Sequence, residues 1–249
     1  LDRIYQGGEA LCIHNAATGR ELTMPHVISP ADARKSIVVV GAGPGGLEAA
    51  RVCAERGHEV TVFEAADQPG GQIRLTTQTP RKREMIGIID WRMAQCAARN
   101  VRFHFNTYAD AADVTAITPD IAIIATGGLP NLELFETRGE ADHVVSTWDI
   151  LSGEAKPAGR VLIYDESGDN PGLQAAEMVA DAGCEVEVMT PDRSIAPDVM
   201  GMNLTPYLRN LQTRHVRLTV AERLLGVTRE GNQLAATIGT DYSDFIRKQ

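Results

Sequence analysis

Short apolar runs alternate with longer amphipathic segments along most of the chain. Residues 37–40 form an apolar, β-branched run, which is typical of a strand buried on both faces of a parallel sheet. Residues 46–57 follow with a helical pattern, and residues 58–64 predict a second strand. Strands and helices that alternate in this order predict an α/β fold with a parallel, doubly wound sheet.

The alternation continues to about residue 128. Residues 101–108 and 120–128 predict further strands, of which the second has the composition of a buried strand. A loop and an amphipathic helix are expected before them, within residues 70–100. The inner face of this helix would consist of five side chains at roughly helical spacing: Met85, Ile88, Ile89, Met93 and Cys96.

A second unit of the same order begins at Gly159. Residues 160–165 predict a strand, residues 173–183 a helix and residues 184–190 another strand. A further helix is expected next, and then two strands joined at the turn 230–233. The repeated order predicts two Rossmann-like nucleotide-binding lobes with parallel sheets.

We therefore expect four parts. Residues 1–34 show little periodicity and are interpreted as an extended lead-in. Residues 35–129 would form the first lobe, residues 130–158 a crossover and residues 159–249 the second lobe. Because the chain starts without Met and its last nine residues show no finished terminal element, we interpret it as a piece of a longer polypeptide.

Composition narrows the class of partner. The net charge is −9, and the longest basic cluster is the tripeptide 81–83, so we expect no nucleic-acid partner. No apolar run approaches the length that spans a bilayer, which gives no indication of a membrane partner. The four cysteines are scattered without a C-x-x-C pair, which favours reduced thiols and a cytoplasmic location.

The turn after the first strand has the pattern of a pyrophosphate site. Gly41, Gly43 and Gly46 stand in G-x-G-x-x-G spacing: the first permits a tight bend, the second lets the backbone approach the anion, and the third lets helix and strand pack closely. The second strand ends in Glu64, about 20 residues after the first glycine, where a carboxylate accepts hydrogen bonds from ribose hydroxyls. The sequence thus predicts a site for an adenine dinucleotide, or at least for its ADP half.

Residues 38–74 and 121–128 resemble the two-dinucleotide-fold flavoproteins related to glutathione reductase. The whole chain is similar to the C-terminal half of the NADH:flavin oxidoreductase group, in which an old-yellow-enzyme-type barrel is fused to such a half, as in the trimethylamine dehydrogenase and 2,4-dienoyl-CoA reductase branches. Residues 146–177 are most similar to the branch of N-methylproline-demethylase-like enzymes.

The resemblance implies a set of cofactor-binding residues. They comprise the pyrophosphate turn, the ribose acid with its neighbour, a GGQ loop along the cofactor, a segment bordering the adenine and an ATG turn under the cofactor: Gly41, Ala42, Gly43, Pro44, Gly45, Gly46, Glu64, Ala65, Gly70, Gly71, Gln72, Tyr108, Ala109, Ala125, Thr126 and Gly127. Tyr108 could equally belong to the core. The GGQ loop favours FAD, and ADP is the alternative, because the glycine turn recognises only the half that the two share.

The resemblance also implies groups outside this chain. In that group an FMN lies in the barrel, and four cysteines between barrel and lobes hold a 4Fe-4S cluster through their thiolates. Cys12 is similar to the last of these cysteines, and the other three ligands would precede Leu1. The strand that closes the flavin lobe in the family would follow Gln249.

The second lobe lacks the glycine pattern. Within residues 165–172, only Gly172 falls where a glycine of the motif should stand, the last one, and the turn is about two residues too long. Asp165, Glu166 and Asp169 would place three carboxylates where a pyrophosphate lies and repel it, so we expect no NAD(P)H here. A divalent metal held by oxygen ligands of this turn is a second interpretation, and a solvated acidic turn is a third.

The resemblance implies a part of a flavin-dependent oxidoreductase that removes a methyl group from a small amine or N-methyl amino acid, with no catalytic residue in this chain and with an electron-transferring flavoprotein as acceptor. An inert docking or structural module and part of an NAD(P)H-dependent enoyl reductase are the alternatives. A self-contained disulphide reductase would need a redox cysteine pair and an intact second motif. The sequence leaves the oligomeric state open.

Overall fold

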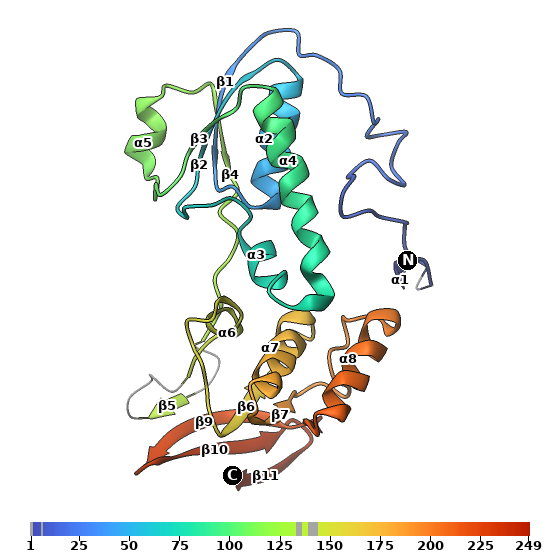
Figure 1. The fold of residues 1–249 in the computed structure, drawn as a ribbon, viewed down its shortest axis with the longest axis vertical. Coiled ribbons are helices and arrows are strands. Elements are labelled where there is room, and N and C mark those ends of the chain that lie inside the picture. Colours follow the sequence, from blue (N-terminus) through green and yellow to red (C-terminus); the bar gives the residue numbers. More distant parts are fainter. Residues whose placement is uncertain (1, 6, 133–135, 139–143) are drawn as a thin grey trace. The chain divides into compact units, whose positions relative to one another are not determined.

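The computed structural model describes residues 2–5, 7–132, 136–138 and 144–249. The chain divides into two compact units, residues 3–128 and residues 129–249, which are described separately (Figure 1). Residues 7–34 contain turns and no regular element after the short helix α1 (Asp2–Tyr5), and they belong to the first unit. The segment expected as a crossover belongs to the second unit.

The first unit is built on a four-stranded parallel sheet with the order β3-β2-β1-β4. Its elements in chain order are β1 (Ser36–Val40), α2 (Pro44–Glu55), β2 (Glu59–Phe63), α3 (Gln72–Thr76), the 3-10 helix η1 (Pro80–Ile86), α4 (Gly87–Ala98), β3 (Arg102–His104), α5 (Ala111–Ala116) and β4 (Ile121–Ile124). Val40 is in register with Phe63 on one side and with Ile124 on the other. The carboxyl ends of these three strands therefore lie at one edge of the sheet.

The core of the first unit lies between this sheet and two helices. Helix α2 packs against α4 and against β1 and β2. The expected inner face of the 70–100 segment is largely correct, since Ile88, Ile89 and Cys96 are buried in this core. Met85 and Met93 are partly buried beside it, and Met85 lies in η1 rather than in α4.

The expectation that residues 120–128 form a buried strand is wrong. Strand β4 forms there, but Ile121 is 41% exposed and Ile124 is 69% exposed. The strand pairs only with β1 and is the edge strand of its sheet. Its apolar composition resembles that of a central strand, because composition alone does not show where in a sheet a strand lies.

The second unit contains a three-stranded parallel sheet with the order β6-β7-β8. Its elements are β5 (Glu136–Arg138), α6 (Thr147–Ser152), β6 (Arg160–Tyr164), α7 (Asn170–Asp181), β7 (Glu185–Met189), α8 (Gly201–Thr213), β8 (Arg217–Thr219), β9 (Arg223–Glu230), β10 (Gln233–Thr240) and β11 (Ser243–Lys248). Helix α7 packs against α6, α8, β6 and β7. The buried Tyr207 and Leu211 of α8 belong to the same core.

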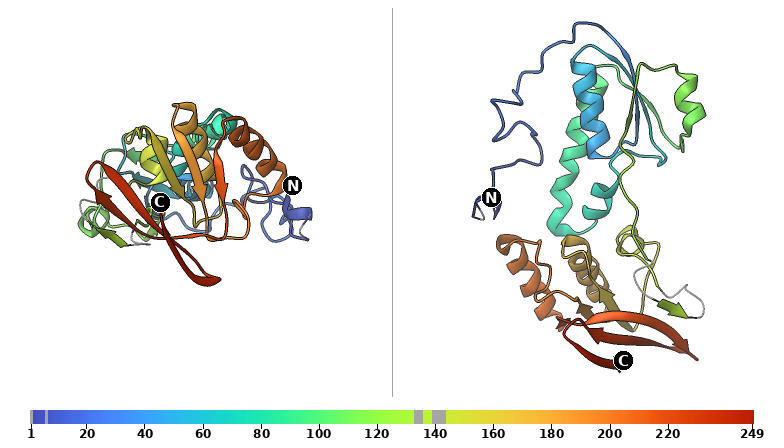
Figure 2. Two further views of the ribbon diagram at one scale, coloured as in Figure 1. Left: turned by 90° about the horizontal axis from the view of Figure 1, so that it is seen from below. Right: turned by 180° about the vertical axis from the view of Figure 1, so that it is seen from behind.

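A second sheet follows, with the order β11-β10-β9-β5. The hairpin expected at the turn 230–233 is confirmed as β9 and β10, the long antiparallel strands in Figure 2. The sequence showed no finished terminal element in residues 241–249, and the structure corrects this: these residues contain the strand β11, which pairs antiparallel with β10. The α/β class with parallel sheets is confirmed, with this additional mixed sheet.

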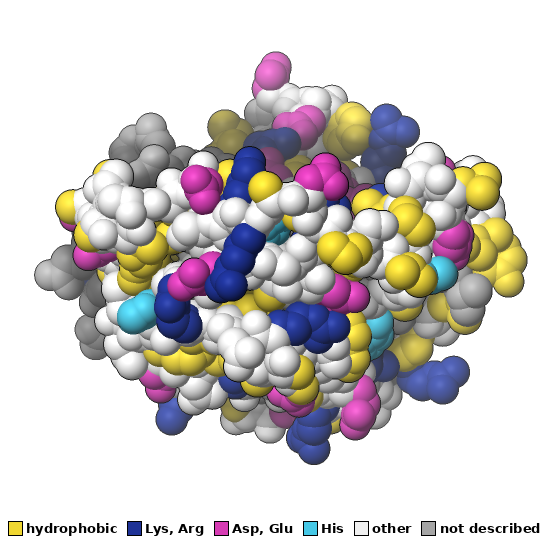
Figure 3. Space-filling view, turned by 90° about the horizontal axis from the view of Figure 1, so that it is seen from above, with side chains coloured by type: hydrophobic (Ala, Val, Ile, Leu, Met, Phe, Trp, Pro, Cys, Tyr) yellow, Lys and Arg dark blue, Asp and Glu magenta, His cyan; other side chains and the backbone are white. Residues whose placement is uncertain are grey.

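Charged side chains of both signs are spread over one face of the molecule. On the face shown in Figure 3, basic side chains are interspersed with acidic ones rather than gathered in one patch. Within the ranges that the structure describes, no helix is long and apolar enough to cross a membrane.

Candidate functional site

On one side, the glycine turn between β1 and α2 is in close contact with the backbone of neighbouring elements. The Gly41 N–H donates to the carbonyl of Phe63 at 2.8 Å, which joins the turn to the end of β2. Gly41 has a φ of 103°, and a Cβ there would stand 2.4 Å from the carbonyl oxygen of Ala125. At Gly46 a Cβ would stand 1.9 Å from the carbonyl oxygen of Gly41. These two glycines are required because the backbone of turn, helix and β4 meet there.

The other side of the turn is open. A Cβ at Gly43 or at Gly45 would meet no atom within 4 Å. Gly43 is the N-cap of α2 and its side-chain position carries no capping group, so no side chain of its own satisfies the first N–H groups of the helix. A helix start with free N–H groups and open space beside it is suited to an anion.

The GGQ loop lies against this turn. The Gly70 N–H donates to the carbonyl of Ala42 at 2.9 Å. A Cβ at Gly71 would stand 3.4 Å from the Cα of Gly43, so the two backbones approach closely. Arg74 supports the loop from the far side, since its Nε donates to the carbonyl of Pro69 at 2.5 Å.

The ATG turn after β4 completes the group of loops. The Ala125 N–H donates to the carbonyl of Val40 at 2.8 Å, which continues the pairing of β4 with β1. Thr126 lies beside the first turn, because its Cα would be 3.2 Å from a Cβ at Gly41. A Cβ at Gly127 would stand 3.7 Å from Nε2 of Gln72. Three loops that are distant in sequence thus converge at one edge of the sheet.

Glu64 follows β2 at the same edge. Its carboxylate accepts from the N–H of Ala42 at 2.6 Å and from the N–H of Ala66 at 2.9 Å, so it ties the glycine turn to the end of β2. The residue is half-buried, and Ala65 beside it is exposed. A carboxylate has about four acceptor positions, so two hydrogen bonds leave capacity for ribose hydroxyls.

Tyr108 and Ala109 follow β3 in the next loop. This loop is joined to the ribose acid, because the Thr107 N–H donates to the carbonyl of Glu64 at 2.9 Å. Tyr108 is 90% exposed and is therefore not a core residue, while Ala109 is half-buried. The structure places both beside the end of β2, and their contact with an adenine stays a prediction.

Cys12 lies apart from this edge, in the exposed lead-in. The backbone N–H groups of His14 and Asn15 hydrogen-bond its sulfur and lower the pKa of the thiol, which favours the thiolate. Burial instead raises the pKa of the Cys96 thiol to about 11. Within the described part of the chain, no group of three or more His, Cys, Asp or Glu side chains is arranged to hold a metal ion.

Two arginines with structural roles were not expected from the sequence. Arg74 packs over Gly70, where a Cβ would stand 3.0 Å from its Cγ. Arg92 is only 5% exposed; its Nε lies 2.9 Å from Oε2 of Glu48, and it donates to the carbonyl of Ile88 at 3.0 Å. The sequence did contain a signal for the burial of Arg92, because this residue stands among the apolar residues of one helix face.

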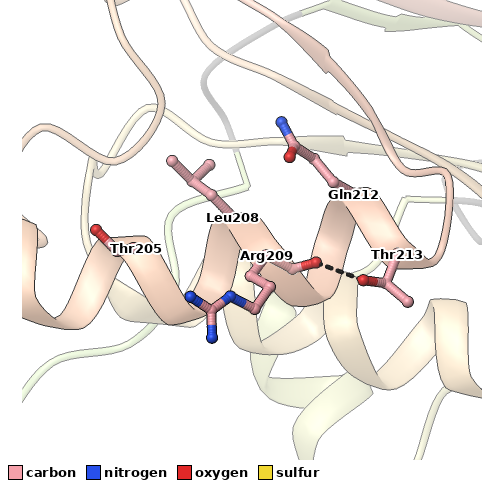
Figure 4. Close-up of a pocket in the computed structure, with 5 residues that line it drawn as sticks. All are labelled: Thr205, Leu208, Arg209, Gln212 and Thr213. Carbon is pink, nitrogen blue, oxygen red and sulfur yellow. Dashed lines mark hydrogen bonds between the residues drawn. The ribbon is translucent and has the colours of Figure 1, made fainter.

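Two hollows are lined by residues other than those of the glycine turn. In the first unit, a cavity of about 680 Å³ adjoins α2 and α4, and its arginines are already paired, Arg51 with Glu48 and Glu55, and Arg99 with Glu55. In the second unit, a groove of about 540 Å³ runs along α8. Figure 4 shows its side chains spread along one helix face rather than converging: Thr205, Leu208, Arg209, Gln212 and Thr213.

The acidic turn of the second unit differs from its expected form. The three carboxylates do not gather at one point, because each has its own partner. Glu166 pairs with Arg223, and Asp169 accepts from the N–H of Asn170 at 2.7 Å at the start of α7. Asp165 is buried. The side chains therefore diverge, and a shared divalent metal at this turn finds no support in their geometry.

The chain matches the family "Pyridine nucleotide-disulphide oxidoreductase" over residues 35–246. It is 61% identical to the probable N-methylproline demethylase of Rhizobium meliloti (strain 1021), over 100% of this chain and 36% of that protein. It is 45% identical to the N,N-dimethylglycine/sarcosine dehydrogenase of Chromohalobacter salexigens, over 98% of this chain and 36% of that protein.

Among solved structures, the chain is similar to a 2-naphthoyl-CoA reductase with a TM-score of 0.82 and 31% identity, over 92% of this chain and 34% of that one. The chain thus spans about a third of the length of these relatives. The part that it shares with them includes the three loops.

Proposed function

Since this chain belongs to the pyridine nucleotide-disulphide oxidoreductase family, we propose that it is the nucleotide-binding part of a flavin-dependent amine oxidoreductase and holds FAD in its first unit. One observation carries this proposal. The glycine turn, the GGQ loop and the ATG turn converge beside Glu64, and the helix start between them is open at Gly43 and Gly45.

The residues fit the ADP half of the cofactor. The N–H groups at the start of α2 would bind the pyrophosphate, and Glu64 would accept hydrogen bonds from the adenosine ribose. The GGQ and ATG loops would lie along the remainder of the molecule. Bound FAD supplies two-electron redox chemistry, and the chain's contribution is to bind and orient it.

ADP alone is the competing ligand, because the turn and Glu64 would contact only the part that ADP and FAD share. Equilibrium titration of the ligand-free chain with FAD, followed by flavin fluorescence, tests the proposal. We expect saturable binding that ADP displaces, and a Glu64→Gln variant with about tenfold lower affinity, since a neutral amide is a weaker acceptor. Binding of ADP with no binding of FAD would contradict the flavin assignment.

The reaction of the whole protein is a proposal that rests on the named relatives. One is named as a probable demethylase of N-methylproline and the other as a dehydrogenase of N,N-dimethylglycine and sarcosine. A small N-methylated amine would lose a hydride equivalent to an FMN held outside this chain, and water would hydrolyse the iminium to the demethylated amine and formaldehyde. We place this protein in the cytoplasm, in keeping with its unpaired cysteines.

Cys12 would be one of four thiolate ligands of a 4Fe-4S cluster in the whole protein. Its fit rests on its exposure and on the backbone N–H groups that hydrogen-bond its sulfur, because these bonds favour the thiolate form that binds iron. Electrons would leave through an electron-transferring flavoprotein. Reduction of the full-length protein by NADPH at the rate of turnover would contradict this acceptor.

A further inference from the structure

The two units place equivalent backbone positions at the end of their first strands. In the first unit, the N–H of Gly41 donates to the carbonyl of Phe63 at 2.8 Å. In the second unit, the N–H of Asp165 donates to the carbonyl of Met189 at 2.9 Å. Each donor directly follows the first strand, and each acceptor ends the neighbouring strand. Asp165 therefore stands where the first glycine of the nucleotide turn stands.

The same comparison identifies the position of the ribose acid. The Glu64 N–H donates to the carbonyl of His104 at 2.9 Å, and the Thr190 N–H donates to the carbonyl of Thr219 at 3.0 Å. Thr190 thus takes the place of Glu64. It is 1% exposed and carries no charge, so the second unit has no carboxylate for an adenosine ribose at this position.

The side chain of Asp165 occupies its own turn. It is 5% exposed, and its Oδ1 accepts from the N–H of Ser167 at 3.0 Å, from Oγ of Ser167 at 2.7 Å and from the N–H of Gly168 at 3.2 Å. Backbone N–H groups of such a turn are the donors that a phosphate would need. Here they are already bound to a carboxylate of the same chain.

The carboxylate also fills the space between turn and helix. Gly172 is the third residue of α7, as Gly46 is the third residue of α2. A Cβ at Gly46 would meet the backbone oxygen of Gly41, whereas a Cβ at Gly172 would stand 2.9 Å from Cγ of Asp165. In the second unit a charged side chain therefore lies where the first unit has only backbone.

The loop after β7 covers this turn. The N–H of Asp198 donates to the carbonyl of Gly168 at 2.9 Å. A Cβ at Gly168 would stand 3.0 Å from Cγ of Pro197. Ile195 and Val199 of the same loop are buried in the core of the unit. The loop after β7 thus packs against the part of the turn that contains Gly168.

From these contacts we propose that Asp165 determines which lobe accepts a dinucleotide: its carboxylate binds the N–H groups of the second turn that a phosphate would otherwise bind. The second lobe is then closed to NADH and NADPH by an internal anion and not only by general charge repulsion. This inference goes beyond the function proposed for the first lobe and does not depend on which nucleotide that lobe holds.

Amide resonances of Ser167 and Gly168 test the inference directly. The experiment uses the 249-residue chain, with its first site saturated by FAD or ADP, and sodium pyrophosphate as the probe. In the wild type, both amides should be protected from hydrogen exchange and unaffected by pyrophosphate. In Asp165→Gly, exchange should be at least about tenfold faster, which corresponds to the loss of one hydrogen bond, and pyrophosphate should shift both resonances saturably.

Asp165→Asn is the matched variant. Its side chain has the same shape and its amide oxygen still accepts hydrogen bonds, but it carries no charge. Its amides should exchange several-fold faster than in the wild type and still give no response to pyrophosphate. Fast exchange in the wild type, a wild-type response to pyrophosphate, or a folded Asp165→Gly chain without a response would each overturn the inference. If Asp165→Gly does not fold, the inference is still tested by amide exchange and the pyrophosphate response in the wild type and in Asp165→Asn. Nucleotide binding at the first lobe is measured separately, so its failure would be distinguishable.

Discussion

The Cα of Gly46 faces the carbonyl oxygen of Gly41, and a Cβ built at position 46 would stand 1.9 Å from that oxygen. Gly46→Ala should therefore lower the free energy of unfolding by about 2–3 kcal/mol, because helix α2 must move away from the turn. Urea unfolding followed by circular dichroism measures this. Gly45→Ala is the control in the same helix: its Cβ meets nothing, so stability should be unchanged or raised by up to about 1 kcal/mol. Equal stability of the two variants would contradict the close packing.

Gly43 separates binding from stability. It has a φ of −69° and a ψ of 178°, which alanine adopts without strain, and a Cβ there would enter open space. Gly43→Ala should leave the thermal midpoint within about 2 °C of the wild type while weakening FAD or ADP binding by at least about tenfold, since the methyl group occupies the approach of the pyrophosphate. Isothermal titration calorimetry measures the affinity. Gly87→Ala, also in open space but at the start of α4, should bind normally, and unchanged binding by Gly43→Ala would place the pyrophosphate elsewhere.

The cysteines should differ in reactivity. Cys12 is exposed and its thiol pKa is lowered by the backbone N–H groups of His14 and Asn15, whereas burial raises the pKa of Cys96 to about 11. Iodoacetamide reacts with the thiolate, so at neutral pH it should modify Cys12 at least about tenfold faster than Cys96. Peptide mass spectrometry over a time course measures both rates. In urea the two cysteines should be modified at similar rates. If Cys12 is modified more slowly than Cys96 in the folded chain, a stabilised thiolate at Cys12 is excluded.

Glu48 should give a specific acid dependence of stability. Burial opposes ionisation of this carboxyl, but the hydrogen bonds and charges of Arg51 and Arg92 outweigh it and lower its pKa below the ordinary value of 4.5. A carboxyl with a lowered pKa stabilises the fold above its ordinary pKa, and this contribution is lost as the pH falls through the lowered value. Glu48→Gln should therefore be about 1–2 kcal/mol less stable at pH 7, with a difference that shrinks below pH 4.5.

Urea unfolding between pH 3 and pH 7 measures this difference. Glu185→Gln is the control, because Glu185 is 78% exposed and lies 4.0 Å from Arg160, so its loss should change stability little at any pH. A difference between Glu48→Gln and the wild type that is constant over this range would show that the carboxylate charge has no part in it.

The first unit could be predicted from sequence because its signals are local. The run of β-branched residues, the three spaced glycines and Glu64 follow one another within about 30 residues, and each constrains only its neighbours. The convergence of the GGQ and ATG loops on this turn was implied by the family resemblance. The structure adds the contacts that cause it, such as the hydrogen bond from Gly70 to Ala42.

Features that depend on distant partners could not be predicted in this way. The exposure of β4 follows from its place at the sheet edge. Strand β11 forms because it pairs with β10, although the neighbouring apolar residues Phe245 and Ile246 do not show the alternation of a half-buried strand. The acids of the second turn were recognised, but the directions of their side chains were not. Glu166 turns toward Arg223, 57 residues away in the chain, while Asp165 folds back into its own turn.

The central claim is that the first unit holds FAD, and identification of the nucleotide released from the purified, denatured protein tests it most directly. Chromatography with absorbance detection gives both identity and amount. We predict FAD at about one per chain, as expected for a single intact glycine turn. ADP or AMP in its place, or no nucleotide together with no uptake of added FAD, would contradict the claim.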